Sequence, residues 1–379
     1  MQNYDVAIIG GSCAGAASGY TLAKAGRKTV IIDKAVFPRK KVCGGMITEK
    51  TVALLQQVYD HTPVEPVIDS AYAAYSIYYA GPEKICTYTH PSNRLYSVDR
   101  AVFDNYFLQK AAAAGCDIIS GQKAVGIQGN TITFSSGEMV RAGHIIGADG
   151  AHSIVRRSLY PEIRKRHFAM GLEVDVGYEG LKCFDNGEDI CPQIYFGIMN
   201  SGYGWVFPRK DHATVGIGGV LRFNKDNIRN LFISFLKKVA RGSIDPLLSK
   251  IAGFPVPLHN YVKKPARDNV FLAGDAAGFV EPVSGEGIYF AVLSGRFAAE
   301  SIIAGGNSAD KYNHLIQKHI HRLFKQAYFV KRILFWPGVL SYTMSRMSKD
   351  IRYAKLYYDL ISGEIDYIQY TKNLMRKRK

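Results

Sequence analysis

A glycine-rich turn directly after an apolar strand, close to the start of the chain, constrains the fold more than any other feature. Residues 6–9 are apolar and partly β-branched, which predicts a buried parallel strand. Gly10 and Gly15 bracket the turn, small residues predict a helix to about Ala25, and a second apolar strand ends at Asp33. Such a βαβ unit points free helix N–H groups at a phosphate, and an acidic residue about 20 positions on accepts hydrogen bonds from a ribose hydroxyl.

The turn departs from the G-x-G-x-x-G fingerprint at one position, where Ser12 replaces the middle glycine. An ordinary tight turn between a strand and a helix has a similar local sequence. The location after the first strand, with Asp33 following the second, favours a site for an adenine dinucleotide.

Length and charge bound the class of protein. A chain of 379 residues favours two closely joined domains, and 47% apolar with 21% charged residues is typical of a globular protein. The formal net charge is +16, and residues 311–379 hold fifteen Lys and Arg against four Asp and Glu. This local excess predicts an anionic partner, either a membrane surface or nucleic acid, unless it is only a solvated basic tail.

The cysteines and the apolar runs indicate the cellular compartment of the protein. Six cysteines are scattered without a C-x-x-C pair, so we expect no disulfide framework, no metal site and a reducing compartment. Asp5 interrupts any signal-peptide core, and the sequence contains no run of 18 apolar residues that would span a bilayer. We therefore expect a cytoplasmic protein.

A loop with adjacent glycines follows Asp33. A basic run at residues 39–41 leads into Cys43, Gly44 and Gly45. A Gly-Gly pair is typical of backbone that approaches another group closely. The basic run is typical of solvated surface, but beside a dinucleotide site it also suits phosphates. Cys43 alone is typical of a small buried side chain.

Two charged residues stand at the ends of predicted elements. Arg100 lies in the first turn of a helix that begins at Asp99, where a cation is unfavourable, so a phosphate partner and a plain surface position are both open. Asp149 follows an apolar strand, in an Asp-Gly turn that Ser153 caps. Its carboxylate could bind a ribose, bind a water that contacts phosphate, or simply shape the turn.

The middle of the chain predicts a second sheet. Residues 73–90 predict a hairpin and residues 193–219 a meander of three strands. The two-residue period of a strand puts Tyr203, Trp205 and Phe207 on one face. An aromatic face of this kind is either plain core or the wall of an apolar pocket.

A third strand end carries glycines and an acidic residue. Residues 269–273 predict a strand before Gly274 and Asp275, and residues 285–288 lead into a helix of small residues to about Ile303. The carboxylate suits polyol hydroxyls. The helix N-terminus suits an electron-rich ring edge, because it stabilises a nearby anion by roughly 0.3–1 kcal/mol.

The chain from residue 309 predicts helices. Residues 323–336 combine an apolar band with Lys325, Lys331 and Arg332, and residues 353–360 form a second apolar stripe. Such stripes pack on their own protein or, with this basicity, rest on an anionic membrane, where each Lys or Arg contributes about 1 kcal/mol.

Three elements in this order resemble the flavoprotein hydroxylase superfamily: residues 10–15 with Asp33, the turn at residues 149–156, and Gly274-Asp275 before a glycine-rich helix. The resemblance covers roughly the first 305 residues. Within it, the motif K-V-C-G-G at residues 41–45 and the strand Y-G-W-V-F-P at residues 203–208, followed by G-I-G, are similar to the geranylgeranyl reductase family. That family reduces isolated C=C bonds of polyprenyl lipids.

The resemblance implies an FAD site and a lipid site. For FAD it implies Gly10, Ser12, Cys13, Ala14, Gly15, Asp33, Lys34, Cys43, Gly44, Gly45, Arg100, Asp149, Gly274, Asp275, Gly285, Glu286, Gly287 and Ile288. For the lipid it implies Tyr203, Trp205, Phe207 and Pro282, with Cys43 as a candidate catalytic residue. It implies no metal, and NADPH, NADH and a ferredoxin-type donor all stay open as the external reductant.

The implied reaction is hydride transfer from reduced flavin N5 to an alkene carbon of a polyprenyl lipid, with protonation of the other carbon. A flavin monooxygenase or halogenase acting on a lipophilic or aromatic substrate would share every FAD motif. A third alternative is a non-catalytic protein that binds lipid or membrane and keeps FAD as structure. Nucleic acid is disfavoured because no recognised binding module accompanies the basic excess.

We therefore predict an α/β protein with an α+β second domain. A Rossmann-like FAD-binding domain is expected from residues 1–70, 98–165 and 265–305. An antiparallel-sheet substrate domain is expected from residues 71–97 and 166–264. Residues 306–379 are expected to form a basic helical region in peripheral contact with an anionic membrane.

Overall fold

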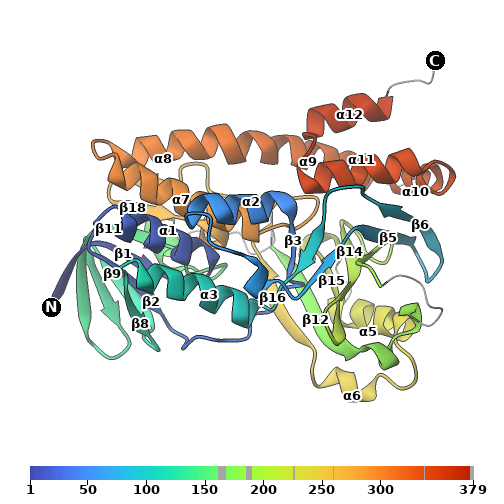
Figure 1. Cartoon of the computed structure of the whole chain (residues 1–379), viewed down its shortest axis with the longest axis horizontal. Coiled ribbons are helices and arrows are strands. Elements are labelled where there is room, and N and C mark those ends of the chain that lie inside the picture. Colours follow the sequence, from blue (N-terminus) through green and yellow to red (C-terminus); the bar gives the residue numbers. More distant parts are fainter. Residues whose placement is uncertain (161–167, 185–189, 225–226, 259, 337, 376–379) are drawn as a thin grey trace.

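Two large sheets, one mainly parallel and one mainly antiparallel, form the two halves of the molecule (Figure 1). The computed structural model describes residues 1–379 except 161–167, 185–189, 225–226, 259, 337 and 376–379. A small third sheet of β3 (Met46–Thr48), β7 (Leu95–Ser97) and β4 (Ser70–Tyr72) forms from the segments that pass between the halves. The α/β class with a second, α+β half is confirmed.

The first sheet has the strand order β17-β18-β11-β1-β2-β8. At its centre, β1 (Gln2–Ile9) pairs in parallel with β2 (Thr29–Asp33) and with β11 (Met139–Gly147). The carboxyl ends of these three strands meet at one edge, so the loops that follow them lie together. The remaining strands are β8 (Asp117–Ser120), β9 (Ala124–Gln128), β10 (Thr131–Phe134), β17 (Ala266–Arg267) and β18 (Val270–Leu272).

Helices of small residues cover this sheet. The first, α1 (Cys13–Lys24), packs between α3 (Arg100–Ala113) and α7 (Ile288–Ile303). A Cβ on Gly295 would lie 2.3 Å from the carbonyl oxygen of Ala14, so glycine allows α7 to cross α1 this closely. The other helices of this half are α2 (Glu49–Val58) and α4 (Ile154–Leu159).

The second sheet has the order β16-β12-β15-β14-β13-β5-β6 and is antiparallel except for the parallel pair of β5 and β13. The predicted hairpin and meander are confirmed. Its strands are β5 (Ala74–Tyr79), β6 (Lys84–Thr89), β12 (Ala169–Gly177), β13 (Gln193–Phe196), β14 (Gly202–Pro208), β15 (His212–Val220) and β16 (Ala252–Val256). On one face, Val206 and Val215 form a core with Phe232 and Phe235 of α5 (Ile228–Val239).

The opposite face of the second sheet is partly covered by the end of the chain. The C-terminal helices are α8 (Ser308–Ile316), a π-helical turn (Gln317–His321), α9 (Arg322–Leu334), α10 (Val339–Lys349), α11 (Ile351–Ser362) and α12 (Tyr367–Met375). The hydroxyl of Tyr75 on β5 donates to the carbonyl of Ala354 on α11 at 2.7 Å, and the ring of Tyr357 contacts that of Phe196. The basic C-terminal region is therefore packed structure, seen along the top of Figure 1.

Short helices complete the fold: α6 (Asp245–Leu248) and the 3-10 turns Glu65–Val67, Tyr178–Gly180, Lys182–Phe184, Leu221–Phe223 and Gly274–Ala276. None of the helices among the described residues is both long enough and apolar enough to cross a bilayer.

Candidate active site

The turn after β1 accepts only glycine at two positions. Gly10 has φ +103°, and a Cβ there would lie 2.3 Å from the carbonyl oxygen of Ala148. A Cβ on Gly15 would lie 1.8 Å from the carbonyl oxygen of Gly10. The N-terminal turn of α1 thus sits directly on the strand end, with Cys13 and Ala14 in its first turn. Its amides are the free donors that bind anions at helix N-termini.

The carboxylate of Asp33 is fixed beside this turn. Its Oδ2 accepts the N–H of Gly11 at 2.7 Å and its Oδ1 accepts the N–H of Ala35 at 2.9 Å. Asp33 is buried, whereas its neighbour Lys34 is exposed. The ribose-binding role implied for Asp33 stays a prediction.

Ser12, the departure from the fingerprint, belongs to a buried polar network with α3. Its Oγ donates to Asp104 Oδ2 at 2.8 Å and accepts from Arg100 Nη2 at 3.0 Å. Arg100 Nη2 also lies 2.8 Å from Asp104 Oδ1. Although burial opposes both charges, each partner favours the charge of the other: the pKa of Arg100 is raised and that of Asp104 is lowered.

Arg100 is therefore not a surface residue. Asp104 already pairs with it, so a phosphate would not be its only anionic partner. The sequence signal for this pair was the spacing of four between Arg100 and Asp104 on a predicted helix. Ser12 extends the network to the nucleotide turn, so a polar side chain is useful there.

Asp149 lies at the end of β11, next to Gly10. Its Oδ2 accepts the N–H of Ile154 at 2.7 Å, so it shapes the turn before α4, and Ser153 Oγ accepts the N–H of Arg156 at 2.8 Å. Asp149 Oδ1 is buried and has no hydrogen-bond partner among the described residues. Burial raises the pKa of Asp149. A buried, unpartnered acceptor beside the glycine turn is what a bound hydroxyl would satisfy.

The turn at Gly274 brings the third motif to the same place. A Cβ on Gly274, which has φ +56°, would contact Ala14 and Ala291, so this turn packs on the first turn of α1. A Cβ on Gly287 would lie 3.7 Å from Asp275 Oδ1. Gly287, directly before Ile288 at the start of α7, is thus next to Asp275, and Gly285 lies in the same loop.

These segments fit FAD. The turn at residues 10–15, Asp33, Asp149 and the Gly274–Ile288 segment come from four distant stretches and lie along the same strand ends. They offer backbone N–H donors for phosphate, carboxylates for hydroxyls, and a helix N-terminus at α7 for a ring edge. The residues present therefore fit FAD as the cofactor.

The loop of Cys43, Gly44 and Gly45 lies between the two sheets. The N–H of Cys43 donates to Glu173 Oε1 at 2.7 Å. A Cβ on Gly44 would lie 2.9 Å from the ring of Phe207, and Gly45 has φ +67°. Arg209 Nη2 donates to the carbonyl of Gly44 at 3.2 Å. The Gly-Gly pair is therefore needed for close packing against β14.

Tyr203, Trp205 and Phe207 form one aromatic wall, as the strand period predicted. Ring centroids are 5.9 Å apart for Tyr203 and Trp205 and 6.0 Å apart for Trp205 and Phe207. All three side chains are half-buried, whereas Gly204 and Val206 between them are buried against α5. One face of β14 is core, and the other is an apolar surface beside the 43–45 loop.

Glycines on β15 make room for the indole. A Cβ on Gly216 would lie 2.3 Å from the Trp205 ring, and one on Gly218 would lie 3.3 Å from it. Trp205 Nε1 is buried without a hydrogen-bond partner among the described residues. At the end of the wall, the Tyr203 hydroxyl donates to the carbonyl of Ser284 in the loop before α7.

Glu173 is the site residue that the sequence analysis missed. On β12 it pairs in register with Gly216, which pairs with Trp205, so all three face the same side of the sheet. Its side chain is 8% exposed, and burial raises the pKa of Glu173 to about 7. The only sequence feature that could have indicated Glu173 is its place two residues after Gly171. The structure pairs this strand with the G-I-G segment.

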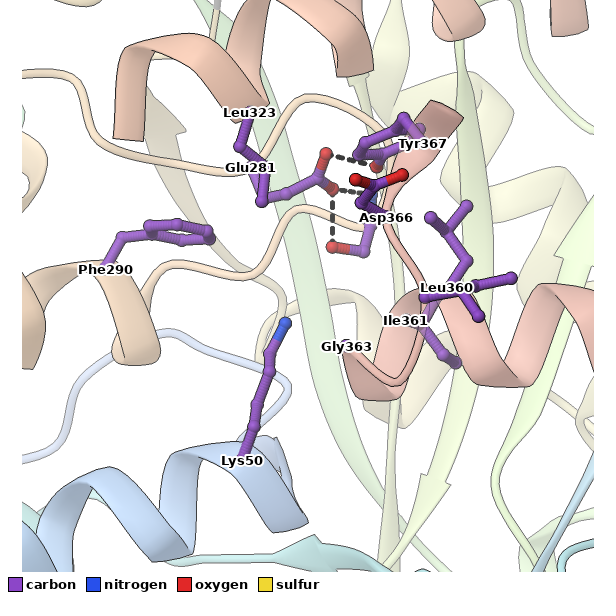
Figure 2. A pocket seen from close by; sticks show the side chains of 11 residues that line it. Lys50, Glu281, Phe290, Leu323, Leu360, Ile361, Gly363, Asp366 and Tyr367 are labelled. Atoms are coloured by element: carbon purple, nitrogen blue, oxygen red, sulfur yellow. Dashed lines mark hydrogen bonds between the residues drawn. The ribbon is translucent and has the colours of Figure 1, made fainter. Parts of the chain in front are cut away.

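A cavity of about 110 Å³ lies on the other side of the loop before α7 (Figure 2). Lys50 of α2 and Phe290 of α7 point into it, and Glu281 and Tyr367 lie at its wall. Glu281 accepts hydrogen bonds from Ser284 and Tyr367, and Lys50 Nζ lies 2.7 Å from Glu286 Oε2. The sequence analysis implied Glu286 for FAD; here its carboxylate pairs with Lys50.

Pro282, implied for the lipid, is also tied to the C-terminal helices. Its carbonyl accepts a hydrogen bond from Lys331 Nζ of α9 at 2.7 Å. Burial lowers the pKa of Lys331 to about 8, against the opposing effect of Glu281. The loop of residues 281–286 is thus held from α2, α9 and α12, which positions the loop that precedes the α7 N-terminus.

Comparisons with known proteins agree with an FAD-binding fold. A family model described as an FAD binding domain matches residues 3–180. A crystal structure of a geranylgeranyl bacteriochlorophyll reductase-like protein from Thermoplasma acidophilum has the same fold, with a TM-score of 0.76, 24% identity and 92% of each chain covered. The fold and the site together define an FAD-dependent oxidoreductase.

Two curated relatives narrow the class. An uncharacterized protein of Methanosarcina barkeri is 31% identical, over 91% of this chain and 87% of its own length. The chloroplastic geranylgeranyl diphosphate reductase of Nicotiana tabacum is 29% identical, over 80% of this chain and 67% of its own length. The chain belongs to the FAD-dependent oxidoreductases and is similar to proteins named geranylgeranyl diphosphate reductase.

Proposed function

We propose that this protein reduces C=C double bonds in a polyprenyl, geranylgeranyl-type lipid. The observation that carries the proposal is the aromatic wall of Tyr203, Trp205 and Phe207, which lies against the 43–45 loop and joins the loop before α7 at Ser284. An apolar wall between two cofactor-side loops suits a hydrocarbon chain. The name of the Nicotiana tabacum relative supports the same substrate class.

When bound in its reduced form, FAD would supply the hydride for an alkene carbon. The chain's own residues bind the lipid and exclude water. Tyr203, Trp205 and Phe207 offer apolar surface to isoprene units, and Arg209 holds the 43–45 loop against them through the carbonyls of Gly44 and Val98. Excluding water strengthens every charge interaction inside the site and protects reactive groups.

The second alkene carbon needs a proton, and in this proposal Glu173 holds it at its carboxyl. Glu173 is in register with Trp205 through Gly216, and it accepts the N–H of Cys43. An acid whose pKa lies near the working pH both releases a proton and recovers one, and burial brings the pKa of Glu173 to about 7. Cys43, whose N–H donates to this carboxyl, is the second candidate.

A flavin monooxygenase or halogenase is the alternative reaction. A halogenase would need a lysine available at the flavin. Among the described residues, Lys50 and Lys331 lie next to the loop before α7, and both are engaged, because Lys50 pairs with Glu286 and Lys331 donates to Pro282. At this loop, the observation favours the reductase over the halogenase.

The deciding experiment is anaerobic. The yellow protein is reduced with dithionite, then mixed with geranylgeranyl diphosphate, a geranylgeranyl glycerophospholipid or a geranylgeranyl ester, while flavin absorbance and product mass are followed. The proposal expects flavin reoxidation without oxygen and a product heavier by two hydrogens per step. The lipid that reacts fastest identifies the head group.

Two other outcomes contradict the proposal. Reoxidation only after oxygen is admitted, with an oxygenated product, would establish the monooxygenase. Stable reduced flavin with every prenyl lipid, in a protein that nevertheless binds those lipids, would support the non-catalytic alternative.

A further inference from the structure

The outer side of the C-terminal helices is unusually apolar for a surface. On α9 and just beyond it, Phe329, Ile333 and Trp336 are 64%, 46% and 61% exposed, and Tyr342 on α10 is 65% exposed. Residues four apart lie on one side of a helix, so Phe329 and Ile333 form one stripe on α9, and Trp336 follows just after the helix ends. We call the four residues the docking face.

The opposite side of α9 accounts for the rest of the predicted apolar band. Phe324 and Ala327 are fully buried, and Leu323 and Leu334 pack under α12 and α11. The band of residues 323–336 therefore divides into an inner half that packs on the protein and an outer half that does not. Packing on this chain does not explain the outer half.

The charges around the docking face are basic. Arg322, Lys325 and Arg332 lie on the same outer stripe and are exposed, and none of them forms an ion pair with a residue that the structure describes. Of the acids in the adjoining α11 segment, Asp350 pairs with Arg352 and Asp359 pairs with Lys355. An apolar centre with Trp and Tyr and a basic rim is complementary to an anionic lipid surface.

We propose that this protein rests on an anionic lipid bilayer through the docking face of α9 and α10, with Phe329 and Trp336 inserted among the lipids and Lys325 and Arg332 against the head groups. The inner sides of the same helices contact the proposed lipid site. Phe335 and Met344 pack in the cluster that contains Tyr203 and Phe207, and Lys331 holds Pro282. The proposal thus puts the apolar wall next to the membrane that would hold its substrate.

The test uses the FAD-loaded protein and sedimented vesicles of phosphatidylcholine with or without phosphatidylglycerol. We expect binding to the anionic vesicles that weakens as salt rises. Phe329→Ser with Trp336→Ser should lower the partition coefficient at least about tenfold, and Lys325→Gln and Arg332→Gln about fivefold for each charge removed. Val102→Ser and Lys123→Gln, exposed on the FAD-binding half, are the matched controls and should bind like the wild type.

A second readout uses the only two tryptophans, Trp205 and Trp336. In a Trp205→Phe background, Trp336 is the sole reporter, and its emission should shift to the blue only with anionic vesicles. Retained FAD and an unchanged Tm establish that each variant is folded.

Equal binding by the docking-face variants and the wild type, or no preference for anionic lipid, would overturn the proposal. So would a dimer that the Phe329→Ser, Trp336→Ser variant converts to a monomer, because a second copy would then cover the face. The assay contains neither substrate nor reductant, so its failure leaves the proposed reaction untouched, and failure of the reaction leaves the binding result untouched.

Discussion

The two sheets build their shares of the site by opposite means. At the parallel sheet the cofactor site is mostly backbone: glycine turns, helix N-termini and carboxylates held by N–H groups. At the antiparallel sheet the site consists of side chains on one face, namely the aromatic wall and Glu173, with glycines opposite them. A backbone site restricts which residues may have a side chain, whereas a side-chain site depends on which residues strand pairing places together.

The largest effect should come from a side chain in the nucleotide turn. In Gly15→Val the new Cβ would lie 1.8 Å from the carbonyl oxygen of Gly10, so the backbone must move. We expect a loss of at least about 3 kcal/mol, roughly a hundredfold in FAD affinity, measured by flavin fluorescence titration. Gly126→Ala, whose Cβ meets only ordinary contact, is the control. A yellow Gly15→Val protein would show that the turn does not hold the cofactor.

The buried pair of Arg100 and Asp104 should rank next. Arg100→Met leaves the buried Asp104 with Arg39, at 3.6 Å, and the Ser12 hydroxyl as its partners, so the cost in the free energy of unfolding should be about 3 kcal/mol, the lower end for a broken buried pair. Chemical denaturation measures it, and the double variant Arg100→Met, Asp104→Leu should recover most of the loss. Breaking the exposed pair of Lys24 and Asp60 by Lys24→Gln should cost no more than about 1 kcal/mol. Equal costs for the two pairs would refute a structural role for Arg100.

Glu173→Gln should change how the free energy of unfolding depends on pH. The folded protein holds this proton more tightly than the unfolded chain, because burial raises the pKa of Glu173 from 4.5 to about 7. Wild type therefore loses stability as pH rises from about 4.5 to 7, and the variant does not. The variant should gain about 2–3 kcal/mol relative to wild type between pH 4.5 and pH 8 in urea denaturation.

Asp60→Asn, just beyond α2, is the matched control for Glu173→Gln. Hydrogen bonds from Lys24 and Tyr20 hold the pKa of Asp60 below 3.8, so this residue stays ionised across the same pH window. Its difference from wild type should be constant there. A parallel pH dependence for the two variants would place the effect outside Glu173. In the proposed reaction, Glu173→Gln should also slow product formation.

Gly216→Ala tests most directly whether the parallel sheet holds FAD independently of the lipid site on the antiparallel sheet. The added Cβ would lie 2.3 Å from the Trp205 ring, so the indole must leave its place at a cost of about 1–3 kcal/mol. We expect full FAD content and little anaerobic reoxidation by prenyl lipid. Gly126→Ala again serves as control. Loss of FAD instead of activity would mean that the two sites are not built independently.

The smallest effect is expected for Trp205→Phe. Trp205 Nε1 has no hydrogen-bond partner among the described residues, so its removal breaks no bond, and the change in unfolding free energy should stay below about 1.5 kcal/mol. Trp205→Ala should cost about 3 kcal/mol, near the lower end for a large aromatic, because the side chain is half-buried. Similar losses for Phe and Ala would reveal a partner for the indole N–H.

Features set by local sequence were predictable. The β1–α1 turn, the hairpin at β5 and β6, the helix from Ile288 to Ile303 and the shared face of Tyr203, Trp205 and Phe207 all follow from glycine placement and from periods of two or of three to four residues. They depend on conformational preferences that act within a few residues.

Other features depended on partners far away in the chain. Glu173 and Asp175 alternate with valines and look like the solvent side of a strand; only the pairing of β12 with β15, and the 43–45 loop above it, bury Glu173. Ser12 gains its role from Asp104, which lies 92 residues away.

The sequence by itself determined an FAD fold, because the close approach of backbone to backbone leaves glycine as the only solution at Gly10 and Gly15. It did not determine which half of the apolar band at residues 323–336 is core. That was decided by the tertiary structure, since α11 and α12 cover one side of α9 and leave Phe329 and Trp336 exposed. A helix period defines a face, but only packing decides what the face meets.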